Sequence, residues 1–147
     1  MNGWLLARIA LLAFVAISSF FVPLGQQASP PLSWQALGVI FVFCPVALVI
    51  VLGLQTLNPR SAGLWHKPSW SLNPFNFKEP VQFFHLGAYV FIIQGTVTLA
   101  RATASQAISI EVLVPLAMGM GILVGLEVCR KLFRSKFAAQ PGAAPDP

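Results

Sequence analysis

The chain has 147 residues, of which 56% are hydrophobic and only 9% are charged. A soluble domain carries about 25% charged residues, so this composition excludes an ordinary cytosolic protein, and its high hydrophobicity excludes a disordered chain. The two cysteines, Cys44 and Cys129, lie far apart in apolar runs, which fits neither a disulfide framework nor a zinc site. The sequence therefore predicts an integral membrane protein, without indicating its biochemical function.

Four apolar stretches are long enough to cross the hydrocarbon core of a bilayer, which is roughly 30 Å thick and needs about 20 helical residues. We predict an all-α integral membrane protein whose residues 1–137 form a four-transmembrane-helix bundle, followed by a disordered tail over residues 138–147. An alternative for the first stretch is a signal peptide with Arg8 in its basic region. The spans are expected at about residues 4–24, 35–57, 81–100 and 108–129.

The basic residues indicate an orientation. In a four-span chain, both termini and the middle connection share one side, and that side holds eight of the nine Lys and Arg residues. Because positively charged residues stay on the cytoplasmic side, we predict cytoplasmic termini and a location in a bacterial inner membrane. The same residues lie at membrane edges, so they favour contact with anionic headgroups and do not indicate nucleic-acid binding.

The middle connection, residues 58–80, contains four prolines, which prevent a continuous helix. Its Trp and Phe residues alternate with Lys67 and Lys78, and aromatic and basic residues together are typical of the headgroup region. We predict a rigid, irregular segment on the cytoplasmic face of the membrane. It is either a membrane-anchored linker or a docking platform for a protein or a lipid. The docking residues would be Trp65, Trp70, Phe75 and Phe77.

Polar side chains follow one face of the third expected span. Gln82, His85 and Tyr89 lie close together on a helix with 100° per residue. Polar residues within a span either hydrogen-bond to neighbouring helices or mark a functional path, and both interpretations are kept. Gln94 and Thr98 lie on a second side of the same span. Because a helix that is polar on two sides is expected to face other helices, we predict a central position for this span.

Arg8, His85 and Glu127 are expected at similar depth near the cytoplasmic ends of three different spans. One interpretation joins them in a single layer with an Arg8–Glu127 ion pair, which would offset the cost of charges inside the membrane. The other interpretation is local. Glu127 then pairs with Lys131 one turn further along, and Arg8 extends its charge toward the membrane surface.

The fourth expected span carries Gly121 and Gly125 in a pattern of small residues spaced four apart. Small residues at this spacing let another helix approach closely. The approaching helix is expected to be the third span of the same chain or part of another protein. Residues 130–137 are expected to continue as a basic amphipathic extension along the cytoplasmic interface.

The sequence contains no catalytic triad pattern, no carboxylate pair with a credible pocket, no metal-ligand cluster and no phosphate-binding glycine loop. We therefore predict no catalytic residues and no cofactor. The favoured function is a non-catalytic accessory or assembly subunit of a larger membrane complex, with other membrane proteins as partners. The alternative is a small oligomeric transporter or channel that uses the layer of Arg8, His85 and Glu127. A lipid-modifying enzyme with His85 as base is a third hypothesis.

Overall fold

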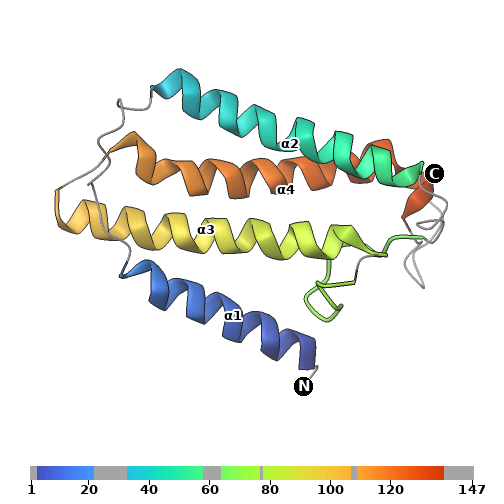
Figure 1. The fold of residues 1–147 in the computed structure, drawn as a ribbon, viewed down its shortest axis with the longest axis horizontal. Helices are drawn as coiled ribbons and strands as arrows, with labels where there is room; N and C mark the ends of the chain where they lie inside the picture. Colours follow the sequence, from blue (N-terminus) through green and yellow to red (C-terminus); the bar gives the residue numbers. More distant parts are fainter. Residues whose placement is uncertain (1–2, 22–32, 58–63, 77, 107–108, 138–147) are drawn as a thin grey trace, which may run out of the picture.

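The computed structural model describes residues 3–21, 33–57, 64–76, 78–106 and 109–137. Within these ranges the protein is all-helical apart from one isolated β-bridge, which confirms the predicted all-α class (Figure 1). The α-helices are α1 (Gly3–Ser19), α2 (Trp34–Thr56), α3 (Pro80–Ala104) and α4 (Val114–Leu132). Two short 3₁₀ helices, η2 (Ile110–Leu113) and η3 (Arg134–Lys136), lie before and after α4.

Three of the helical stretches are long and apolar enough to cross a membrane: α2, α3, and η2 together with α4. Helix α1 is apolar but shorter, with 17 residues. It ends at Ser19, whereas the sequence predicts a first span that extends to residue 24. Residues 22–24 of that expected span lie outside the described residues, as does the whole expected tail, residues 138–147. The first expected span, and with it the total of four spans, therefore stays a prediction.

The helix boundaries follow local chemistry. The Ser33 side chain accepts a hydrogen bond from the Ala36 amide at 3.2 Å and so caps the start of α2. Proline occupies the first turn of α3, as Pro80, and of α4, as Pro115, where a missing backbone donor costs nothing. Pro115 also explains why α4 starts at Val114, several residues later than the sequence predicts, with the 3₁₀ turn η2 in front of it.

The helices lie side by side in the order α2, α4, α3, α1 (Figure 1). Helix α4 packs against both α2 and α3, and α1 lies along the other side of α3. The predicted central position of the third span is therefore confirmed. Residues 64–76 with residues 78 and 79, called the linking segment from here on, lie at the end of the bundle where α1 begins and α4 ends. We call this end the segment end.

Gly121 and Gly125 let α2 approach α4 closely. A Cβ atom at Gly121 would lie 2.9 Å from Cys44 Cβ, and one at Gly125 would lie 2.8 Å from Pro45 Cα. The helix that uses this small-residue face is therefore α2 of the same chain, and not the third span or another protein. Since α2 covers both glycines, they are not available for docking, which corrects the docking role expected from the sequence.

A second pair of glycines, which the sequence pattern did not indicate, brings α4 close to α3. A Cβ atom at Gly119 would lie 2.7 Å from the Ala88 carbonyl oxygen. A Cβ atom at Gly95 would lie 2.6 Å from Leu116 Cγ on α4. Helix α4 thus approaches both α2 and α3 closely. Close packing at small residues is typical of helices in membranes, where the hydrophobic effect does not drive helices together.

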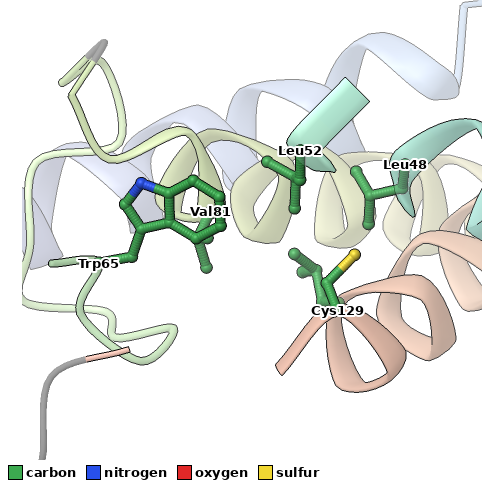
Figure 2. Close-up of a cluster of buried hydrophobic side chains, with 6 residues drawn as sticks. Leu48, Leu52, Trp65, Val81 and Cys129 are labelled. Atoms are coloured by element: carbon green, nitrogen blue, oxygen red, sulfur yellow. The ribbon is translucent and has the colours of Figure 1, made fainter. Parts of the chain in front are cut away.

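The large apolar side chains mostly point outward. On α2 only Leu48 and Leu52 are buried, although the whole helix is apolar. A helix that is apolar all round and little covered by protein is typical of contact with lipid. The buried hydrophobic cluster lies at the segment end, where Val81 and Cys129 meet these leucines and Trp65 of the linking segment (Figure 2).

Candidate functional site

Trp65 fixes the start of the linking segment. Its ring is fully buried in the hydrophobic cluster (Figure 2), and its amide donates a hydrogen bond to the Lys136 carbonyl at 2.6 Å. The ring also meets Phe137 edge-to-face, with ring centres 5.7 Å apart. Trp65 is therefore an internal packing residue and is not exposed for docking as the sequence suggests.

The contact with Phe137 changes the expected course of the chain end. Helix α4 ends at Leu132, and the 3₁₀ turn η3 then directs Phe137 back to the linking segment. The basic stretch 130–137 is therefore not one amphipathic helix along the membrane surface. It packs at the segment end, with its last described residue against Trp65.

Gln82 fixes the middle of the linking segment. Its side chain is fully buried at the start of α3. The side-chain oxygen accepts a hydrogen bond from the Ser69 amide at 3.0 Å, and the side-chain nitrogen donates to the carbonyls of His66 and Lys67 at 3.2 and 3.1 Å. One amide thus satisfies three backbone groups of an irregular segment, which has no helical hydrogen bonds to pair them.

Arg8 connects α1 to the linking segment. The residue is 1% exposed, and its Nη2 donates a hydrogen bond to the Leu72 carbonyl at 2.8 Å. Its Nη1 lies 3.4 Å from His85 Nδ1. Because a guanidinium only donates, Nδ1 is the acceptor, and a neutral His85 then carries its proton on Nε2. The guanidinium carbon also lies 5.8 Å from the centre of the Trp70 ring, within the range of a cation–π contact.

Trp70 packs on the polar stripe of α3. Its ring centre lies 5.4 Å from that of His85 and 4.7 Å from that of Tyr89. His85 and Tyr89 lie 5.1 Å apart, so the three rings form one cluster. The sequence prediction that Gln82, His85 and Tyr89 share a face is confirmed, and all three contact the linking segment.

Glu127 does not join Arg8 and His85. Its carboxylate accepts two hydrogen bonds from Arg130, at 2.6 and 2.9 Å, and its side chain is 50% exposed. This corrects the three-residue layer with an Arg8–Glu127 pair. For Glu127 the local interpretation describes the geometry, although the partner is Arg130 and not Lys131. For Arg8 it is wrong, because this side chain is buried beside His85 and does not extend outward.

Two further parts of the linking segment are defined. His66 Nδ1 lies 3.1 Å from a Glu79 carboxylate oxygen, which joins the two ends of the segment. Phe75 is 57% exposed and borders a cavity of about 220 Å³ beside Arg8. Phe77, also expected to take part in docking, lies outside the described residues.

Sequence reasoning identified the side chains of this site but not their acceptors. The groups that bind Arg8 and Gln82 are mainly backbone carbonyls and an amide, which every residue carries, so no sequence pattern marks them. The presence of Arg8 and Gln82 in otherwise apolar helices does indicate that each has hydrogen-bond partners, since buried polar groups need them.

In the part of the chain that the structure describes, no three His, Cys, Asp or Glu side chains gather closely enough to hold a metal ion. Comparison with protein-family models, curated proteins and solved structures finds no match to this chain. The functional argument therefore rests on the geometry of the segment end.

Proposed function

We propose that this protein is a non-catalytic accessory or assembly subunit of a larger membrane complex. The observation that supports this most is that buried polar side chains hold the backbone of the linking segment in place. Gln82 and Arg8, from two different helices, hydrogen-bond to the backbone of the linking segment. A segment whose shape is fixed in advance loses less conformational entropy on binding, which favours its use as a docking surface.

Exposed apolar side chains at the segment end support a docking role. Leu64 and Phe75 of the linking segment are each 57% exposed, and Phe83 on the first turns of α3 is also exposed. Aromatic residues are enriched in the centres of protein interfaces. We propose that this surface contacts other membrane subunits. Trp70 packs the linking segment onto α3 through its ring contacts with His85 and Tyr89.

The proposed subunit has four spans and cytoplasmic termini, in a bacterial inner membrane. The distribution of charge supports this orientation, because Arg101 lies at the far end of α3 and the other described Lys and Arg residues lie at the segment end. Those residues are Arg8, Lys67, Lys78, Arg130, Lys131, Arg134 and Lys136.

A small oligomeric transporter or channel is the competing proposal. The buried contact between Arg8 of α1 and His85 of α3 favours it. Its weak point is that Arg8 is bonded to the Leu72 carbonyl, and Glu127 is bonded to Arg130. A path past Arg8 and His85 would require the hydrogen bond to the Leu72 carbonyl to break during transport. Glu127 would not take part in it.

Co-purification separates the two proposals. The full chain, tagged after Pro147, is isolated from its native membrane in mild detergent and weighed by native mass spectrometry. We expect a stoichiometric complex with other membrane proteins, which is retained in Glu127→Gln and lost when Phe75 is changed to Asp. A homo-oligomer with no other subunit would contradict the proposal and favour the transporter.

A further inference from the structure

Arg8 is a buried cation without an anionic partner in the described residues. Its two hydrogen-bond acceptors, the Leu72 carbonyl and His85 Nδ1, are neutral, and its Nε–H has no acceptor. Glu79 contacts His66, and Glu127 contacts Arg130. A charge held away from water is costly unless an opposite charge or further hydrogen bonds offset it. The arrangement therefore calls for an anion beside Arg8.

The cavity of about 220 Å³ lies where such an anion would bind. Arg8 lines it together with two other buried residues, Pro74 and Leu86, and these form its inner wall. The remaining lining residues, Ala7, Leu11 and Phe75, are exposed and form its rim. The cavity is thus bounded by α1, α3 and the linking segment, with one charged side chain among apolar ones.

We propose that this cavity binds the phosphate group of an anionic membrane phospholipid. The guanidinium group of arginine matches phosphate oxygens in geometry and charge, and Arg8 lines the cavity while its buried Nε–H has no acceptor in the described residues. This site shares Phe75 with the proposed docking surface, but lipid binding requires only the chain and the bilayer.

Two features favour a phospholipid over free phosphate. The rim residues Leu11 and Phe75 are exposed and apolar, so they are suited to acyl chains. Arg8 lies in the second turn of α1 at the segment end, which is the depth expected of the headgroup region.

The test is lipid retention by the purified full chain. The protein is held in mixed micelles containing equal amounts of phosphatidylglycerol and phosphatidylcholine, and bound lipid is counted by native mass spectrometry. We expect one retained phosphatidylglycerol per chain. Arg8→Gln should lower its retention about tenfold or more, because a hydrogen bond between charged groups contributes at least that factor to binding.

Two further variants separate lipid binding from folding and from net charge. Ala7→Phe adds bulk at the rim and keeps Arg8, so it should also lose the lipid while the chain keeps its helix content by circular dichroism. Lys131→Gln removes one exposed positive charge at the same end and should retain the lipid. Equal retention of the two lipids, or unchanged retention in both Arg8→Gln and Ala7→Phe, would overturn the proposal. Displacement of the lipid by millimolar inorganic phosphate would overturn the assignment to a phospholipid.

Discussion

Helices α4 and α1 both pack along α3, but they are held in different ways. Helix α4 approaches α2 and α3 through glycines and packs in the hydrophobic cluster, so its position depends on close apolar packing. Helix α1 buries few side chains, and arginine-to-carbonyl hydrogen bonds hold it at both ends. Arg8 binds the Leu72 carbonyl, and Arg101 on α3 binds the Ser19 carbonyl at 2.6 Å. We therefore expect the core of α2, α4 and α3 to hold its shape without α1, and α1 to depend on polar contacts with α3 and the linking segment.

Removing a side chain from the hydrophobic cluster that joins the linking segment to α2, α3 and α4 should lower the stability most. Trp65→Ala should lower the free energy of unfolding by about 3–5 kcal/mol, because it removes a fully buried aromatic side chain. Dodecyl sulfate titration in mixed micelles measures this change. Trp65→Phe is the matched control. It should retain much of the stability, since the indole nitrogen has no acceptor in the described residues. Equal losses in the two variants would contradict the packing role.

A methyl group added to a glycine of α4 tests the close packing of this helix against α2. Gly125→Ala should destabilise the bundle by about 1–3 kcal/mol, because the new Cβ would lie 2.8 Å from the Pro45 backbone. The same titration applied to Gly38→Ala provides the control. A Cβ atom at that position on α2 would have nothing within 4 Å, so helix propensity should make the change neutral or stabilising. A neutral Gly125→Ala would show that α2 and α4 are not in close contact.

The hydrogen bonds of Gln82 test whether the linking segment is fixed by side chains. Gln82→Leu should cost about 1–3 kcal/mol and speed amide exchange at Ser69, because three backbone groups lose their partner. Hydrogen exchange with mass spectrometry measures the local change. Gln94→Leu, on the same helix, should leave the exchange of the segment as it is. Unchanged exchange in Gln82→Leu would mean that the segment holds its shape without this residue.

The attachment of α1 should respond locally to the loss of Arg101. In Arg101→Gln we expect faster amide exchange near Ser19 at the end of α1, while the amides of α4 stay protected. The same exchange experiment covers both helices in one sample. A uniform loss of protection across α1 and α4 would contradict the independence of the α2, α4 and α3 core.

Glu127 should contribute least. Its pair with Arg130 is exposed and lies within one helix, so Glu127→Gln should change the free energy of unfolding by about 0.5 kcal/mol or less. The dodecyl sulfate titration again gives the value. A loss of several kcal/mol would contradict this local pair and favour the layer of Arg8, His85 and Glu127 expected from the sequence.

The helices were predictable from the sequence because span length and apolar composition are properties of single segments. The partner of the small-residue face was not, since Gly121 and Gly125 show that some helix approaches closely without showing which one. The end of α4 was also missed, because it depends on the non-local contact between Trp65 and Phe137. At the candidate site, the sequence identified Arg8 but not the Leu72 carbonyl that it binds.

Site-specific photo-crosslinking in the native membrane tests the central claim most directly, namely that the linking segment is a docking surface for another membrane protein. A photoreactive residue is placed at Leu64, which is 57% exposed on the segment, and separately at Phe43, which is exposed on α2. We predict a crosslinked product with a distinct membrane protein from position 64 and none with that protein from position 43. Crosslinks from position 64 to lipid alone, or only to further copies of this chain, would contradict the proposed subunit role.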